Sequence, residues 1–324
     1  MLDPLVTVAG ALVGFVVGLT GMGGGALMTP ILVLLFGVEP LTAVSSDIVA
    51  SMIMKPIGGG VHWKRGTVHR GLVKWLVLGS VPSAFLGVLL LRKFGSGVGL
   101  QSNVKLALGV ALLIVSAGLV MKPLLAARKK PGESLLPLAV KPLPTLLIGI
   151  LGGIVVGLTS VGSGSLMIIL LLMLYPRLKL SELVGTDLVQ AVPLVTSAAL
   201  GHLIFGDFKL SLTASILIGS VPGVFFGARF SSRAPDTVIR PALIVVLVVS
   251  GLKLVGMSNV ALAFVGPLSL IGGAAYAIVA TRRAKAAAAA AAPAATAPAP
   301  ESSAHAGERA GRLEAAPAAQ SLTR

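Results

Sequence analysis

The chain has 324 residues, of which 55% are hydrophobic and 11% charged, and it contains no cysteine. A soluble protein carries about a quarter charged residues, so this composition excludes a water-soluble fold and indicates a polytopic membrane protein. The lack of cysteine excludes disulfides, thiolate metal sites and cysteine nucleophiles. The net charge of +15 comes from short basic clusters with few aromatic neighbours, which favours membrane topology over a nucleic-acid partner.

Eleven apolar segments of lengths relevant to a bilayer follow one another along the chain. The first five cover 4–19, 26–37, 44–62, 71–91 and 104–122. The second five cover 142–158, 165–175, 183–205, 211–229 and 238–256, and the last covers 260–280. The start of the chain has neither the basic stretch nor the cleavage site of a signal peptide, so we expect it to open the first membrane segment. The sequence thus predicts an all-α membrane protein with about 8–11 membrane segments.

The two sets of five segments are copies of each other. At an offset of 139 residues, Gly-Leu-Thr at 18–20 recurs at 157–159. At an offset of 140, Gly-Ser-Val-Pro at 79–82 recurs at 219–222. Matches of this length predict an internal duplication, and repeats of this kind place a transporter's site where they meet.

The predicted domains follow from these segments and from the composition of the regions between them. After the last apolar segment the chain is rich in Ala and Pro and has too little apolar surface to build a core. The domains are a first membrane repeat, 1–125; a basic cytoplasmic linker, 126–141; a second membrane repeat, 142–257; a final transmembrane helix, 258–281; and a disordered Ala/Pro-rich tail, 282–324.

Basic residues in the loops bear on the orientation of the repeats, because cytoplasmic loops are enriched in Lys and Arg. If the first two segments of each repeat form one broken span, both repeats point the same way. If those segments are two crossings or a re-entrant hairpin, the repeats are inverted and four basic loops share one side: 62–70, 128–130, 229–240 and 282–285. The opposite side then still receives three basic residues between 92 and 105. We expect inverted repeats with a cytoplasmic C-terminus.

A glycine-rich break interrupts each repeat, at 18–25 and at 157–164. Irregular backbone inside a membrane is tolerated only where it is buried in protein or lines a wet cavity. A helix restarting at Ala26 or Ser165 would direct its N–H groups and positive dipole end into the break, which suits an anion. Close packing of helices through small residues is the alternative explanation.

Two aspartates, Asp47 and Asp187, stand at matching positions of the third segment in each repeat. A charge in hydrocarbon costs at least ~3 kcal/mol, which makes both residues functional candidates. The preceding Ser-Ser at 45–46 and Gly-Thr at 185–186 also resemble helix-capping sequences, so a capping role is the alternative.

Lys55 lies eight residues after Asp47 and therefore about 80° away from it around a helix. Its segment contains no acidic partner on the same face, and the second repeat has Val195 at this position. Such a lysine suits a small anion held away from the symmetry axis, unless its side chain snorkels to an interface. His62 and His202 recur near a segment end, where polar residues are more often structural.

An enzyme is a weaker interpretation. Ser163 and His202 could form the dyad of an intramembrane serine hydrolase, but Val161 stands where the familiar Gly-x-Ser-Gly pattern needs glycine. The sequence has no P-loop and no His, Asp or Glu cluster with metal-ligand spacing. We therefore expect no catalysis, no cofactor and no metal.

With these motifs the sequence resembles the sulfite exporter TauE/SafE family, also described as the 4-toluenesulfonate uptake permease family. The resemblance is carried by the glycine-rich break at 18–25, Pro30, residues 43–47 and their second copy from 157 to 187, and it covers about residues 5–280. It implies a secondary transporter of sulfur-containing or carboxylated anions in the cytoplasmic membrane. The second break, Gly162-Ser163-Gly164, is less glycine-rich than the first.

The leading hypothesis is therefore an alternating-access transporter of sulfite, a sulfonate such as sulfoacetate, or a related organic anion. The expected partners are that anion, the lipid bilayer and a coupling proton or sodium ion, while the oligomeric state is open. A passive anion channel is the alternative, followed by a hydrolase or a non-transporting scaffold. The candidate substrate-binding residues are Gly21, Gly23, Gly24, Gly25, Ser46, Lys55, Gly162, Ser163, Gly164 and Thr186; the coupling candidates are Asp47 and Asp187; the weaker candidates are His62, Gln190 and His202.

Overall fold

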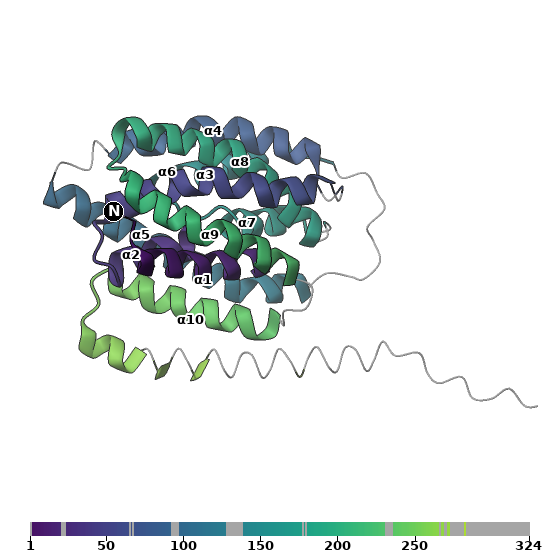
Figure 1. Ribbon diagram of the computed structural model, residues 1–324. Helices are drawn as coiled ribbons and strands as arrows, with labels where there is room; N and C mark the ends of the chain where they lie inside the picture. Colours follow the sequence, from purple (N-terminus) through teal and green to yellow (C-terminus); the bar gives the residue numbers. More distant parts are fainter. Residues whose placement is uncertain are drawn as a thin grey trace, which may run out of the picture. The chain divides into compact units, whose positions relative to one another are not determined.

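The computed structural model describes residues 2–20, 24–64, 66, 68–91, 97–127, 139–176, 178, 180–230, 236–265, 267–268, 271–272 and 282. This part of the chain is helical and contains no strand, which confirms the all-α class. The helices are α1 (Pro4–Thr20), α2 (Gly25–Leu34), α3 (Pro40–Lys64), α4 (Arg70–Leu91), α5 (Val98–Ala127), α6 (Pro142–Thr159), α7 (Leu166–Leu174), α8 (Leu180–Phe205), α9 (Leu210–Phe230) and α10 (Asp236–Leu254) (Figure 1).

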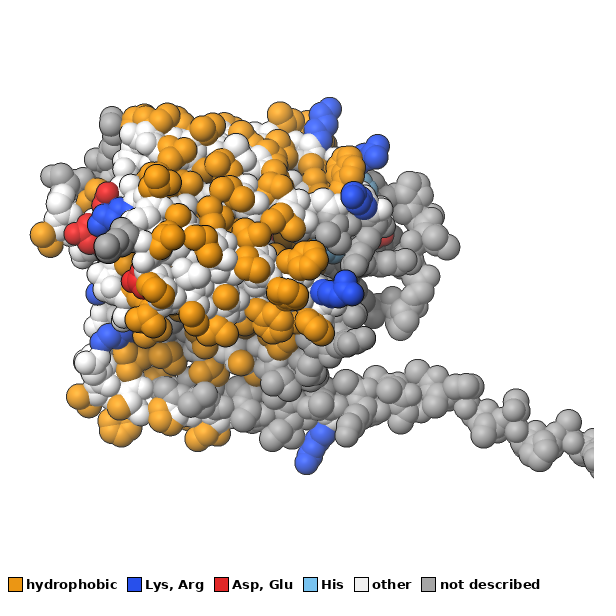
Figure 2. Space-filling model, in the orientation of Figure 1, with side chains coloured by type: hydrophobic (Ala, Val, Ile, Leu, Met, Phe, Trp, Pro, Cys, Tyr) orange, Lys and Arg blue, Asp and Glu red, His pale blue; other side chains and the backbone are white. Residues whose placement is uncertain are grey.

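Five of the described helices are long and apolar enough to cross a membrane, namely α4, α5, α6, α8 and α9. Shorter apolar helices cover Pro4–Thr20, Gly25–Leu34 and Pro241–Leu254. Apolar side chains spread over the middle of the visible face, whereas Lys and Arg gather toward its ends (Figure 2). That distribution matches a surface whose middle is in contact with hydrocarbon and whose ends reach water.

Helices α1 and α2 form a helical hairpin, because the start of α1 and the residues after α2 lie close together. Asp3 caps α1, its Oδ1 accepting hydrogen bonds from the N–H groups of Leu5 and Val6 at 2.9 and 3.3 Å. Asp3 and the residues after α2, from Phe36 to Glu39, line one cavity of about 380 Å³.

Helices α6 and α7 form a second hairpin of the same kind. Lys141 precedes α6 and Tyr175 follows α7, and the Lys141 N–H donates to the Tyr175 hydroxyl at 2.8 Å. Pro142 favours the start of α6 because its φ is already helical and it lacks the N–H that a helix start leaves unpaired.

Each hairpin packs mainly against the other half of the chain, since α1 lies along α9 and α6 lies along α4. A Cβ added at Gly79 of α4 would stand 2.3 Å from the Leu146 carbonyl oxygen of α6. One added at Gly219 of α9 would stand 1.9 Å from the Thr7 oxygen of α1. Glycine therefore permits these helix pairs to approach closely, as small residues do in membrane proteins generally.

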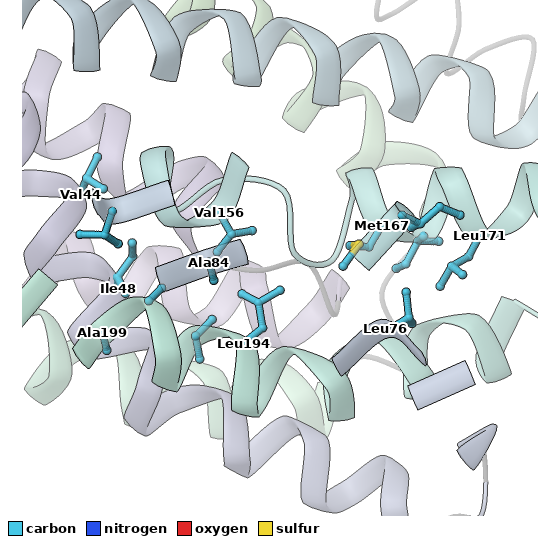
Figure 3. Packing of buried hydrophobic residues seen from close by; sticks show 14 of the residues in the cluster. Val44, Ile48, Leu76, Ala84, Val156, Met167, Leu171, Leu194 and Ala199 are labelled. Atoms are coloured by element: carbon cyan, nitrogen blue, oxygen red, sulfur yellow. The ribbon is translucent and has the colours of Figure 1, made fainter. Parts of the chain in front are cut away.

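The central helices α3 and α8 pack against each other between these pairs, and α5 packs against α10. Around them lies a buried apolar cluster that includes the residues labelled in Figure 3, Val44, Ile48, Leu76, Ala84, Val156, Met167, Leu171, Leu194 and Ala199. This packing fixes α3 and α8, which carry the buried charged residues.

Candidate functional site

The two breaks touch each other at Gly25 and Ser160. A Cβ added at Gly25, the first residue of α2, would lie 2.0 Å from the Ser160 carbonyl oxygen. Gly24 is less confined, since the nearest atom to its added Cβ is the Met54 methyl carbon at 3.9 Å. Gly21 and Gly23, both expected at the site, lie outside the described residues.

The second break runs from Ser160 to Ser165 and is buried throughout. Its backbone is irregular, with φ of 60° at Ser160, 124° at Gly162 and 99° at Gly164. The Gly162 carbonyl accepts hydrogen bonds from Leu166 and Met167 at 3.1 and 3.3 Å. Helix α7 therefore begins inside the break, one residue later than the sequence predicted, and its positive dipole end lies there.

Asp47 connects the two hairpins. Its Oδ2 accepts a hydrogen bond from the Thr29 hydroxyl of α2 at 3.1 Å and one from the Ser160 hydroxyl of the second break at 2.6 Å. Asp47 lies well inside α3, which begins at Pro40, and Asp187 lies well inside α8, which begins at Leu180. The capping interpretation of both aspartates is therefore wrong, because each helix starts seven residues earlier.

Lys55 points into the protein and does not snorkel. Only 9% of its surface is exposed, and its Nζ donates a hydrogen bond to the Ser163 hydroxyl of the second break. The carboxylates of Asp187 and Asp47 lie near enough to attract the ammonium group. A lysine from the first half of the chain thus reaches the start of α7 in the second half.

Asp187 accepts a hydrogen bond from its own helix α8. The Gln190 side-chain amide donates to Asp187 Oδ1 at 3.0 Å, and the Gln190 Oε1 accepts from the Ser80 hydroxyl of α4 at 3.2 Å. Asp47, Lys55, Asp187 and Gln190 are all buried. Burying three charged groups is costly unless they compensate one another, so their shared location indicates a functional site.

The remaining candidates lie apart from this charged group. The Thr186 hydroxyl accepts a hydrogen bond from the His69 N–H at 3.0 Å, next to the start of α4. The Ser46 hydroxyl accepts one from the Lys209 N–H at 3.4 Å, before α9. Both contacts hold loops in place.

The two matching histidines differ. His202 is fully buried, its Nδ1 lying 2.8 Å from the Ser45 hydroxyl and its Nε2 lying 2.8 Å from the Gly157 carbonyl oxygen. Because a carbonyl can only accept, Nε2 carries the proton and Nδ1 accepts from the serine. His62 is half-buried in the last turn of α3. His202 therefore lies in the protein interior, where it ties α8 to α3 and α6.

An apolar cavity of about 520 Å³ lies beside the second break, between α5 and the α6–α7 hairpin. Thr159 and Leu166, which flank the break, form part of its wall. Within the described residues, no group of three His, Asp or Glu side chains is placed to hold a metal ion.

Sequence reasoning missed the hydroxyl donors of the site, Thr29, Ser160 and Ser80. Thr29 and Ser160 have no hydroxyl at the matching positions of the other half, which are Ile168 and Gly21. That asymmetry is visible in the sequence and could have drawn attention to both residues. Ser80, in contrast, recurs as Ser220 and gave no such signal.

Comparison with known proteins gives a consistent result. The model of the family described as "Sulfite exporter TauE/SafE" matches residues 6–254. The probable membrane transporter protein YjnA of Bacillus subtilis is 40% identical over 248 residues, which are 76% of this chain and 97% of the relative. YdhB of the same organism is 24% identical over 75% of this chain and 96% of its own. A probable membrane transporter protein of Xylella fastidiosa is 27% identical over 69% of this chain and 83% of its own. No solved structure matches the chain.

Proposed function

Because the chain belongs to the sulfite exporter TauE/SafE family and is a multi-pass membrane transporter, we propose that it moves a small anion across the cytoplasmic membrane by alternating access. The proposed substrates are sulfite, a sulfonate such as sulfoacetate, or a related organic anion. The transport is coupled to a proton or a sodium ion.

The observation that carries this proposal is the contact of Lys55 with the start of α7. A buried ammonium group, the Ser163 hydroxyl and the positive end of a helix converge there. Together these groups offer charge and hydrogen-bond donors to the oxygens of an anion, as helix N-termini do in many anion sites. The flexible glycines on either side of Ser163 allow the backbone N–H groups to turn toward the ligand.

Helix packing supports an arrangement of inverted repeats. Suppose that α1–α5 correspond in order to α6–α10. The counterpart of the α1–α9 contact is then the α6–α4 contact, which is present. The α3–α8 and α5–α10 contacts each join two corresponding helices, as a two-fold arrangement of repeats requires. Each hairpin begins and ends at one end of the bundle and so makes no crossing. Three crossings per repeat then remain, and an odd number inverts the second repeat. Transporters built in this way hold their substrate where broken helices of the two repeats meet.

The charges at the two ends of the bundle support one orientation. The end of α3, the start of α4 and the end of α9 lie at the same end of the bundle (Figure 1), and these helix ends carry Lys64, Arg70 and Arg229. The opposite end carries Asp3 and Glu39 together with a single lysine, Lys209, in the lining of one cavity. Under the positive-inside rule the first end faces the cytoplasm.

The test is uptake into proteoliposomes that contain the purified chain. Labelled sulfite, sulfoacetate and acetate are supplied with no gradient, with a pH gradient and with a sodium gradient. We expect at least one anion to accumulate against its own gradient when one of the ion gradients is imposed. Flux that no ion gradient drives uphill would identify a passive channel instead, and absence of flux for the whole panel would refute the substrate class.

A matched pair of lysine variants tests the site. Lys55→Met removes the buried charge, whereas Lys64→Met removes an exposed lysine from the same helix. We expect Lys55→Met to lower uptake about 10-fold or more, because a hydrogen bond to a charged group contributes about 1.5–3 kcal/mol. Lys64→Met should transport at the wild-type rate. Equal uptake by both variants would remove Lys55 from the site.

A further inference from the structure

We propose that Asp187 carries the proton that accompanies the anion and that Asp47 is a positioning residue that holds the two hairpins together. This assignment rests on the function proposed above. It follows from the different partners of the two aspartates and from the charge balance of the site.

Asp47 has its accepting oxygen fully engaged. Oδ2 receives hydroxyl hydrogen bonds from Thr29 and from Ser160, one from each hairpin. A proton on either carboxylate oxygen would remove the negative charge of Asp47, and hydrogen bonds to a charged acceptor are about twice as strong as those to a neutral one, so both hydroxyl contacts would weaken. Releasing either contact would separate Asp47 from one of the two hairpins. Asp47 therefore serves the site best as a permanent acceptor.

Asp187 accepts a hydrogen bond that does not join the two hairpins. Its Oδ1 bonds to Gln190 of the same helix, and Gln190 is fixed in turn by Ser80 of α4. Protonation of this carboxyl group leaves the Thr29–Asp47–Ser160 connection intact.

A count of formal charges shows why the anion needs a proton. Asp47, Lys55 and Asp187 together carry one net negative charge when all three are ionised. A bound monoanion adds a second negative charge beside Lys55, in surroundings where like charges repel strongly. When the anion arrives with one proton, and the proton binds the carboxylate of Asp187, the net charge stays at one negative. No covalent bond other than the new O–H bond is formed.

Other titratable groups on the surrounding helices are placed less suitably. Helix α3 contributes Asp47, Lys55, the half-buried His62 and the exposed Lys64, and α4 contributes Arg70 and Lys74, both exposed. Helices α6 and α7 contain no titratable side chain. On α8 itself, Glu182 lies in the first turn, and both ring nitrogens of His202 are engaged by Ser45 and Gly157.

The experiment measures anion binding and proton uptake by the full chain in lipid nanodiscs. Methanesulfonate is the first probe because it keeps one negative charge across the accessible pH range, and sulfoacetate is the second. Protons are counted with an indicator dye in weak buffer. The wild type should take up about one proton per methanesulfonate, and its affinity should fall about 10-fold per pH unit in the alkaline range, as linkage of one proton to one anion requires.

Two carboxamide variants separate the roles. Asp187→Asn should bind methanesulfonate without proton uptake and with an affinity independent of pH. Asp47→Asn should still take up a proton with each anion but should unfold at a lower temperature. Proton uptake that persists in Asp187→Asn, or that vanishes in Asp47→Asn, would overturn the assignment while leaving the proposed transport function in place. Failure of the wild type to bind either probe would count against the proposed function itself.

A second pair of variants keeps the assignment testable if a carboxamide variant does not fold. Gln190→Met removes the donor to Asp187, and Thr29→Val removes one donor to Asp47. Gln190→Met should move the pH midpoint of methanesulfonate binding, because it changes the surroundings of the proton carrier. Thr29→Val should leave that midpoint in place and lower thermal stability. The reverse pattern would contradict the assignment.

Discussion

Asp47 and Asp187 occupy matching positions of the two halves of the chain, yet they accept hydrogen bonds from different kinds of side chain. Asp47 accepts two hydroxyl groups that come from both hairpins, whereas Asp187 accepts an amide from its own helix. The positions that match Thr29 and Ser160 in the other half, Ile168 and Gly21, have no hydroxyl. The comparison teaches that matching positions in a sequence can acquire different hydrogen-bond partners once the helices around them are packed.

Glycine at matching positions also serves two different purposes. Gly25 has no room for a Cβ, which would overlap the Ser160 backbone, whereas Gly164 adopts φ of 99°, where a side chain is strained. Gly25→Ala should therefore cost about 3 kcal/mol or more of folding free energy through overpacking. Gly164→Ala should cost about 1–2 kcal/mol through backbone strain. Thermal unfolding of the purified variants in detergent measures both effects.

Gly24→Ala is the control for these glycine variants, because its Cβ would meet its nearest neighbour at an ordinary contact distance of 3.9 Å. It should yield folded protein with an unfolding temperature close to that of the wild type. If Gly25→Ala proved as stable as Gly24→Ala, the close contact of the two breaks would be refuted.

The two matching histidines offer the next largest contrast. His202→Leu removes two buried hydrogen bonds and leaves the Gly157 carbonyl oxygen without its donor, so it should destabilise the protein by about 2–3 kcal/mol. His62→Leu, at a half-buried position, should cost less than about 1 kcal/mol. Unfolding midpoints in detergent compare the two directly. Equal losses would mean that the histidines kept the same role after the halves diverged.

Ser160 gives the smallest and sharpest contrast. Ser160→Ala and Ser160→Gly both remove the hydroxyl that donates to Asp47, but only glycine adopts φ of 60° without strain. Ser160→Gly should therefore be more stable than Ser160→Ala by about 1 kcal/mol, although both fall below the wild type. The thermal unfolding midpoints of the two variants measure this difference. An alanine variant as stable as the glycine variant would show that Ser160 is not strained.

Composition and apolar segment length were sufficient to predict the all-α membrane class, and the break at 157–164 was correctly predicted to interrupt a helix. The burial of Asp47, Lys55 and Asp187 also follows from their positions within apolar segments. Their partners could not be predicted, because Ser160 and Ser163 reach α3 only through the packing of the second hairpin against the core. Thr186, which precedes Asp187, was predicted to bind substrate. Its hydroxyl instead accepts a hydrogen bond from the His69 backbone, a contact that nothing in the sequence predicts.

Because α1 packs against a helix from the other half of the chain, the order of synthesis affects when the two helices can meet. Helix α1 ends at Thr20, and its main partner α9 begins only at Leu210. At a synthesis rate of about 5–20 residues per second, the first hairpin emerges about 10–40 s before that partner. Throughout this interval the face of α1 that α9 will cover has only lipid or the insertion machinery to contact. The first hairpin must therefore remain without its main packing partner until α9 has been synthesised.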